Sequence, residues 1–354
     1  MKNLRVLVVG LGNMGISHAR AYAAIDGFEI AALCSRGIEA RADLKTEFPG
    51  IPLYADFAEA LAAVKPAAVS INTWPDTHAA YARMALNGDC HVFIEKPLAG
   101  TVAEARDIAA LARARNKKLV IGYILRVHPS WIKFVELGKT LGKPLVMRMN
   151  LNQQSSGAQW EVHKQLMNSI SPIVDCGVHY VDVMCQVTGA KPVAVHAMGV
   201  RLTAEVHETM YNYGQLQVRF DDGSVGWYEA GWGPMMSETA FFVKDMIGPK
   251  GSVSIAMEEA RTASSDVDSH TRTSALRLHH GALKPDGGFA RPDEIIRTED
   301  EPGHQELCNR EQRLFLDAIR NDRDMTDHVE DAINSLRIVL AADESVRTGE
   351  VVRL

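Results

Sequence analysis

The sequence has no apolar run long enough to cross a bilayer, no Cys-x-x-Cys spacing, and no cluster of lysines and arginines with interleaved aromatic residues. With a formal charge of −6, it offers no basic surface for nucleic acid or an anionic membrane. Its five cysteines are typical of reduced, buried thiols rather than a disulfide framework. The first residues lack the longer apolar stretch of a signal peptide. We therefore expect a soluble, cytoplasmic protein.

The length of 354 residues, with 46% apolar and 23% charged residues, predicts two globular domains. Short apolar, β-branched runs alternate with helical stretches in the first third, and Thr101 with Glu104 forms a capping box before one helix. This alternation predicts a right-handed, doubly wound α/β domain over residues 1–122. Its expected strands are Arg5–Val9, Glu29–Leu33, Ala68–Asn72, His91–Ile94 and Lys118–Gly122.

The pattern changes after residue 122, where strand-like runs follow one another without intervening helices. Residues 123–354 are therefore predicted to form an α+β domain with an antiparallel sheet. The polar stretch Thr262–Gly303 is interpreted as long loops. Two C-terminal helices are expected, Glu306–Ile319 and Val329–Thr348, and these could pack back on the first domain. The expected strands are Pro144–Leu151, Pro192–Val200, Gln215–Phe220 and Ser224–Ala230, with a helix over Pro129–Leu137 before them.

A glycine-rich segment follows the first strand directly and opens a helix. Gly10, Gly12 and Gly15 have the G-x-G-x-x-G spacing that permits a tight turn, close approach of a pyrophosphate, and close helix–strand packing. Asn13 and Met14 begin the helix, whose amide groups and partial positive charge attract phosphates. The position at the start of a βαβ unit favours a dinucleotide-binding site over a merely glycine-rich turn.

The end of the second strand bears on the choice between NAD(H) and NADP(H). An NAD site usually has an acidic residue here to accept from the adenosine ribose 2′-hydroxyl. This sequence has Ser35 and Arg36 instead, and Arg36 could pair with a 2′-phosphate. The pattern favours NADP(H), with NAD(H) possible; alternatively, Arg36 stacks on the adenine or points to solvent.

Lys96 follows the strand His91–Ile94 within Glu95-Lys96-Pro97. Ligands of doubly wound sheets bind at the carboxyl ends of the strands, where Lys96 falls. Pro97 restricts the backbone immediately after it. A lone lysine is usually a surface residue, but this position favours a functional one.

Five motifs follow one another along the chain: the glycine-rich segment, Asn72-Thr73-Trp74-Pro75-Asp76-Thr77-His78, Glu95-Lys96-Pro97, Gly122-Tyr123 through Arg126, and Asp175-Cys176-Gly177-Val178-His179. In this order they resemble the glucose–fructose oxidoreductase, inositol dehydrogenase and MocA (Gfo/Idh/MocA) family over essentially the whole chain. The resemblance implies a Rossmann domain and a second domain with a large open, predominantly antiparallel sheet that carries the substrate site and often an oligomer interface. It also implies that Lys96 contacts nicotinamide ribose and substrate, that Asp175 and His179 are the other catalytic positions, and that Trp74 departs from a usually smaller residue. The cofactor neighbours it implies are Thr73, Trp74, Pro75, His78 and Glu95.

Asp175 and His179 also form a chemically sensible pair without the resemblance. Ser171 can cap a helix whose first turn accepts Pro172, and residues four apart then share one face. Gly177 between them weakens a helix by about 1 kcal/mol relative to Ala, which close approach of a ligand would explain. Such a pair is otherwise common as a polar helix face; Lys96 and the glycine-rich segment favour catalysis.

Oxidation of a secondary alcohol requires removal of the hydroxyl proton, which His179 can accept near neutral pH. Lys96 would stabilise the negative charge developing on the same oxygen, and Asp175 would bind a neighbouring hydroxyl or orient His179. Flat aromatic and polar groups suit a hydroxyl-rich substrate, although each could equally be a rim residue. The candidate substrate residues are Lys96, Tyr123, Arg126, Trp160, Asp175, His179 and Trp232. Gln153, Trp160 and His163 are expected on a polar, loop-like stretch after the strand Pro144–Leu151.

The sequence therefore predicts an NAD(P)-dependent dehydrogenase or reductase acting on a sugar, sugar derivative or cyclitol. Two alternatives remain: a glycoside-cleaving enzyme with tightly held NAD, and a non-catalytic dinucleotide-sensing regulator. No metal site is expected, because His279, His280, His304 and Cys308 do not match compact ligand spacings. An exposed antiparallel sheet needs covering, which favours a homodimer or homotetramer.

Overall fold

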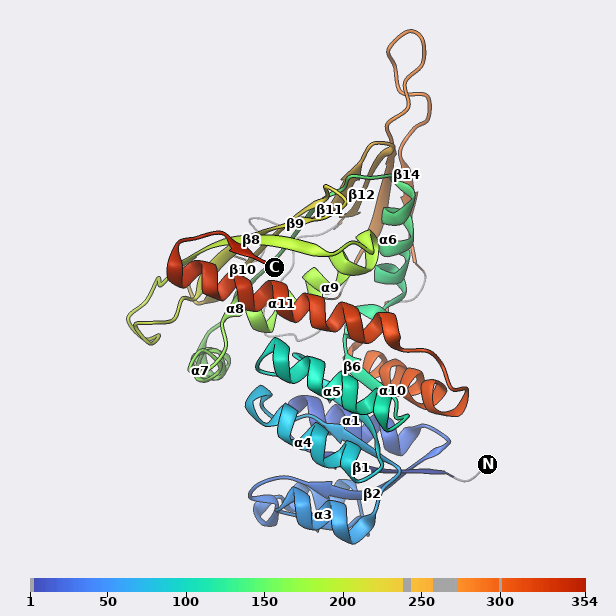
Figure 1. Ribbon diagram of the computed structural model, residues 1–354, viewed down its shortest axis with the longest axis vertical. Helices are drawn as coiled ribbons and strands as arrows, with labels where there is room; N and C mark the ends of the chain where they lie inside the picture. The colour runs from blue at the N-terminus through green and yellow to red at the C-terminus, as the bar shows by residue number, and fades with distance from the viewer. Residues whose placement is uncertain (1–2, 238–242, 257–270, 272, 299–300) are drawn as a thin grey trace. The chain divides into compact units, whose positions relative to one another are not determined.

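The computed structural model describes residues 3–237, 243–256, 271, 273–298 and 301–354 (Figure 1). The chain divides into two compact units, residues 1–124 with 302–333, and residues 125–301 with 334–354. No helix within the described residues is long and apolar enough to cross a membrane.

The first unit contains a six-stranded, wholly parallel sheet in the order β3-β2-β1-β4-β5-β6, which confirms the predicted doubly wound domain. The sequence did not reveal β3, which has only two residues. Thr101 Oγ1 accepts from the Glu104 amide, as the capping box predicted, and its hydroxyl also donates to the Glu104 carboxylate. The strands are β1 (Leu4–Val9), β2 (Phe28–Cys34), β3 (Leu53–Tyr54), β4 (Ala68–Ile71), β5 (His91–Glu95) and β6 (Leu119–Gly122). The helices are α1 (Asn13–Ala24), η1 (Ile38–Ala40), α2 (Ala42–Glu47), α3 (Phe57–Val64), α4 (Pro75–Asn87), α5 (Val102–Ala114), α10 (His304–Arg320) and the first part of α11 (Thr326–Thr348).

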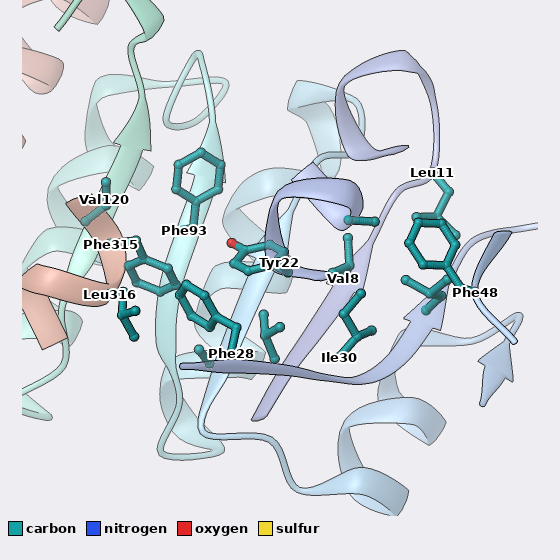
Figure 2. Packing of buried hydrophobic residues seen from close by; sticks show 14 of the residues in the cluster. Val8, Leu11, Tyr22, Phe28, Ile30, Phe48, Phe93, Val120, Phe315 and Leu316 are labelled. Carbon is teal, nitrogen blue, oxygen red and sulfur yellow. The ribbon is translucent and has the colours of Figure 1, made fainter. Parts of the chain in front are cut away.

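The core of this unit is completed by a helix from late in the chain. Figure 2 shows Phe315 and Leu316, which come from α10, beside Phe28 and Phe93 of the sheet. The ring of Phe315 lies 6.4 Å from that of Phe28 and 6.1 Å from that of Phe93. Burial of these rings is worth roughly 1.5–3 kcal/mol each. The amphipathic α10 therefore belongs to the same hydrophobic core as the first strands.

The second unit is built on a nine-stranded sheet in the order β14-β13-β12-β11-β7-β10-β9-β8-β15. All its pairs are antiparallel except β7 with β10, which confirms the predominantly antiparallel prediction. Helices α6, α8 and α9 pack against the sheet. The strands are β7 (Val146–Gln154), β8 (Pro192–Val200), β9 (Tyr213–Phe220), β10 (Val225–Gly233), β11 (Lys244–Gly248), β12 (Gly251–Ala256), β13 (Ala275–His280), β14 (Glu294–Ile296) and β15 (Val352–Arg353). The helices are η2 (Ile124–Val127, starting at the end of the first unit), α6 (Pro129–Thr140), α7 (Gly157–Leu166), α8 (Pro172–Asp175) and α9 (Gly177–Thr188).

Two polar stretches were interpreted wrongly as loops. The stretch Thr262–Gly303 contains two strands, β13 (Ala275–His280) and β14 (Glu294–Ile296). These short runs form strands because β13 pairs with β12 and β14 with β13, and this pairing cannot be predicted from the local sequence. Residues 262–270, 272 and 299–300 of this stretch lie outside the described residues. The polar stretch after β7 contains the helix α7, which has Trp160 and His163 on its buried face.

Candidate functional site

The three glycines of the glycine-rich turn have different surroundings, so each position is glycine for a different physical reason. Gly10 has φ +83°, and a Cβ there would lie 2.5 Å from the Asn72 carbonyl oxygen. A Cβ on Gly15 would lie 1.7 Å from the Gly10 carbonyl oxygen, a spacing that no side chain permits. A Cβ on Gly12 would meet nothing within 4 Å. Packing within the protein thus requires the first and third glycines, whereas Gly12 borders open space, as a pyrophosphate-binding turn requires.

The N-terminus of α1 lies next to this turn. The helix begins at Asn13 with Gly12 as N-cap, and no side chain caps it. Its first turn contains no acidic residue, Asn13 is exposed and Met14 is half-buried. The helix end therefore keeps its partial positive charge available for an anion. These residues fit the phosphates of a dinucleotide.

Two arginines follow β2. Ser35 is half-buried and Arg36 is exposed at the end of this strand. Arg41 was missed by the sequence reasoning: its Nη1 donates to the Leu11 carbonyl oxygen at 3.0 Å, within the glycine-rich turn. Asp43 accepts from the same guanidinium at 2.7 Å and holds the pKa of Arg41 above its ordinary value. A second arginine only five residues beyond Arg36 was the available signal.

The loop after β4 and the first turn of α4 contain four further predicted cofactor neighbours. Trp74 is 40% exposed and precedes α4, which has Pro75 in its first turn. Thr73 Oγ1 lies 2.6 Å from Thr77 Oγ1. His78 is buried, with Nδ1 2.8 Å from the Pro97 carbonyl oxygen and Nε2 2.9 Å from that of Thr73. Burial lowers the pKa of His78. His78 thus joins this loop to the one that contains Lys96.

Glu95, the last residue of β5, is 7% exposed and points into the protein. Its Oε1 lies 2.7 Å from His18 Nε2, and its Oε2 accepts from the Lys96 amide at 3.2 Å. Burial acts to raise the pKa of Glu95, but His18, with Lys96 and His78, lowers it below its ordinary value. The Lys96 backbone is therefore bound to a buried carboxylate. His18 was missed because the sequence shows it only as one polar residue on a helix; its place on the buried face of α1 was the signal.

The segment with Asp175 and His179 departs from the prediction. Ser171 caps α8 by accepting from the Val174 amide, as expected. The predicted single helix is wrong, however, because α8 ends at Asp175 and α9 begins at Gly177. A Cβ on Gly177 would lie 2.8 Å from the Tyr228 ring, so packing against β10 explains this glycine and a ligand is not needed. His179 is 8% exposed in the first turn of α9.

Asp175 borders a network of buried polar groups in the second unit. Cys176 Sγ lies 3.6 Å from Asp175 Oδ2 and 3.3 Å from Gln153 Oε1, and Trp232 Nε1 donates to the same Gln153 oxygen at 2.7 Å. The His163 ring stacks on Trp232 with centroids 4.5 Å apart. Burial lowers the pKa of His163 to about 4, so its ring is neutral at physiological pH.

The other predicted substrate residues have internal partners. Trp160 and Trp232 belong to one hydrophobic cluster, and Trp160 Nε1 donates to Glu205 at 3.3 Å. Tyr123 is buried. Arg126 forms a bidentate ion pair with Asp182 of α9, at 2.8 and 2.7 Å. These contacts show how each side chain is held, and substrate contact stays a prediction for all four.

Three possible metal ligands that are scattered in the sequence come together within the described residues. Donor atoms of His18, Cys308 and Glu311 lie within 4.8 Å of one another. Both nitrogens of His18 are already engaged, Nε2 by Glu95 and Nδ1 by the Gln312 amide. The histidine therefore serves as a link between side chains here.

Two family models match the chain. "Oxidoreductase family, NAD-binding Rossmann fold" matches residues 4–123, and "GFO/IDH/MocA C-terminal domain" matches residues 137–253.

Similar proteins agree with these matches. UDP-N-acetylglucosamine 3-dehydrogenase of Acidithiobacillus ferrooxidans is 32% identical over 205 residues, which are 56% of this chain and 59% of that protein. D-glucoside 3-dehydrogenase of Escherichia coli is 24% identical over 71% of this chain and 77% of its own length. The crystal structure of myo-inositol 2-dehydrogenase from Lactobacillus plantarum shares the fold, with a TM-score of 0.78 at 20% identity and full coverage of both chains.

Proposed function

Because the chain belongs to the GFO/IDH/MocA oxidoreductase family, we propose that it transfers a hydride between a nicotinamide dinucleotide and a CH–OH group of a sugar, sugar derivative or cyclitol. The glycine-rich turn carries this proposal, because its middle glycine borders open space beside an uncapped helix N-terminus. The relatives named for dehydrogenation of sugars and inositols support the substrate class.

The residues of the first unit would hold the dinucleotide. Gly12 and the α1 amides would bind the pyrophosphate, and Arg36 with Arg41 would bind a 2′-phosphate, which favours NADP(H). Asp43 would have to share the Arg41 guanidinium with that phosphate. The bound nicotinamide would supply the hydride acceptor or donor.

His179, Lys96 and Asp175 would carry the proton chemistry. His179 accepts the hydroxyl proton during oxidation and returns it during reduction. The Lys96 ammonium donates to the same oxygen and stabilises its negative charge. Asp175 binds a neighbouring hydroxyl or orients His179.

A substrate screen tests the activity. The chain is incubated with NAD or NADP and with UDP-N-acetylglucosamine, glucosides and inositols, and the nicotinamide absorbance is followed. We expect turnover with at least one compound and a preference for NADP that falls about tenfold in Arg36→Ala, with Arg41→Ala giving a similar loss. Release of sugar without a change in absorbance would favour the glycoside-cleaving alternative. Dinucleotide binding without any turnover would favour the sensor.

The pH dependence tests the assignment of the base. His179→Ala should lower kcat about 10²–10⁴-fold and remove the acidic limb of the pH–rate profile. An unchanged rate and profile in this variant would remove His179 from the acid/base role.

We also propose a homodimer or homotetramer assembled through the nine-stranded sheet. A groove on this sheet is lined by Val146, Val225, Trp227 and Arg219, among others, and the two valines are each 41% exposed. A second copy would cover these apolar groups. Light scattering should give a dimer or tetramer mass for the native chain and a lower mass for Val225→Glu. A monomeric native chain would contradict the proposal.

The cysteines support a cytoplasmic location. All five are buried and none forms a disulfide, as is usual in a reducing compartment.

A further inference from the structure

The buried histidine of α1 lies beneath the end of β5. His18 is fully buried, its ring packs edge-on against Phe93 at 4.8 Å, and its Nε2 lies 2.7 Å from Glu95 Oε1. A fully buried imidazole needs partners for both nitrogens. The second partner comes from α10, where Gln312 Nε2 donates to His18 Nδ1 at 2.9 Å.

The hydrogen bonds run in one consistent direction. The Tyr22 hydroxyl donates to Gln312 Oε1 at 2.6 Å, and the Gln312 amide then donates to His18 Nδ1. Because Nδ1 is an acceptor, the ring proton lies on Nε2 and faces the Glu95 carboxylate. The Lys96 amide donates to the other oxygen of that carboxylate. The series Tyr22–Gln312–His18–Glu95 therefore ends at the Lys96 backbone.

The neighbouring residues leave room for the Glu95 carboxylate and keep it ionised. Gly122 pairs with Glu95 in the sheet, and a Cβ there would lie 3.2 Å from Glu95 Oε1. Glu311, also buried, has no hydrogen-bond partner for either oxygen among the described residues. Burial, followed by the charge of Glu95, raises the pKa of Glu311 well above its ordinary value. Of the two buried carboxyls, the one bonded to His18 and Lys96 carries the charge.

A second buried histidine binds the same loop from another element. His78 of α4 lies 2.8 Å from the carbonyl oxygen of Pro97. The carboxylate thus accepts from the peptide N–H of Lys96, and the imidazole lies at the carbonyl oxygen of Pro97, two peptide groups further along.

We propose that His18 is a positioning residue for Lys96, acting through Glu95, and that Gln312 sets the tautomer of His18. The proposal rests on the proposed function, in which Lys96 binds the reacting oxygen. Release of Glu95 frees the Lys96 peptide, and a misplacement of about 1 Å at a reacting group can lower a rate about 100-fold. Most of the dinucleotide would be held by the glycine-rich turn, so NADPH binding should weaken much less than kcat, even though Lys96 is also expected at the nicotinamide ribose.

The test compares four variants of the full chain. His18→Leu removes the link, and His18→Gln retains an amide that can donate to Glu95. Gln312→Met breaks the series one step earlier. His91→Leu is the matched control. His91 lies at the start of β5, at the end opposite to Glu95, and its ring accepts a hydrogen bond from the Lys118 backbone amide. For each we would measure kcat, KM, the NADPH dissociation constant, the melting temperature, and hydrogen exchange of residues 95–101 by mass spectrometry.

We expect His18→Leu to lower kcat at least about tenfold, leave the NADPH dissociation constant within about twofold, and accelerate exchange of residues 95–101. His18→Gln should regain most of kcat, and Gln312→Met should show a smaller loss in the same direction. A folded His18→Leu with wild-type kcat or wild-type exchange would overturn the proposal, as would an equal loss in His91→Leu. If His18→Leu does not fold, Gln312→Met with wild-type kcat and exchange would overturn it. A native chain that oxidises no sugar or cyclitol would contradict the proposed function instead, while the exchange measurement would still report on the link to Lys96.

Discussion

Replacement of Gly12 by alanine separates a phosphate-binding turn from a turn that is only structural. Gly12 has φ −75° and ψ −166°, a backbone conformation open to L residues, and its added methyl group would meet no atom within 4 Å. Alanine is a poorer N-cap than glycine by roughly 0.5 kcal/mol, but it restricts the unfolded chain by about 0.4–1 kcal/mol. The free energy of unfolding should therefore change by less than about 1 kcal/mol, which shifts the melting temperature by at most a few degrees.

The same methyl group would occupy space that a pyrophosphate needs. We expect Gly12→Ala to weaken NADPH binding about 10- to 100-fold, which corresponds to about 1.4–2.8 kcal/mol of binding free energy. Binding is measured by NADPH fluorescence titration and stability by thermal denaturation. Gly15→Ala is the contrasting variant, because its Cβ would collide with the Gly10 carbonyl and destabilise the fold. Wild-type affinity in a stable Gly12→Ala would refute the assignment of this turn.

Three further outcomes follow from packing and burial. Phe315→Ala removes a fully buried ring and should lower the free energy of unfolding by about 3–5 kcal/mol in urea denaturation; a loss below about 1 kcal/mol would show that α10 is not part of the core. Gly177→Ala forces a methyl group to 2.8 Å from the Tyr228 ring and should cost about 1–3 kcal/mol, and an unchanged melting temperature would contradict this packing. His163 has a folded pKa of about 4 against 6.5 unfolded, so the unfolded chain binds more protons between these values. Above pH 6.5 His163 is neutral in both the folded and the unfolded chain, and its protonation does not affect stability. As the pH drops to 4, only the unfolded chain gains this proton, so the free energy of unfolding falls by up to about 3 kcal/mol. The stability–pH profile of His163→Gln should be flatter over this interval; an identical slope would refute the assignment.

The sequence predicted the elements whose signals are local. The buried runs of β1, β2, β4, β5 and β6 read as parallel strands, and the glycine spacing located the turn before α1. The capping residues Thr101 and Ser171 have their partners three residues away, so the starts of their helices were recognisable. These features depend on neighbours in the chain, and the structure confirms them.

The features that were missed depend on partners distant in the sequence. His18 acquires its role from Glu95 and Gln312, which lie 77 and 294 residues away. Gly177 suggested a ligand because Tyr228, the residue that requires it, lies on a strand whose register the sequence could not fix. Likewise β13 and β14 have only a weak alternation of apolar and polar residues. They form strands because they pair next to β12 at one side of the nine-stranded sheet.

The position of α10 has a consequence for biosynthesis. Phe315 and Leu316 complete the core around Phe28 and Phe93, yet they are encoded after eight of the nine strands of the second sheet, β7 to β14. A nascent chain therefore emerges from the ribosome with its dinucleotide-binding sheet unfinished until residue 320 has been synthesised, and its aromatic surface is open to chaperones in the meantime. A fragment that stops at residue 124 would keep that surface exposed and aggregate, so expression of the cofactor domain alone requires α10 to be fused back to it.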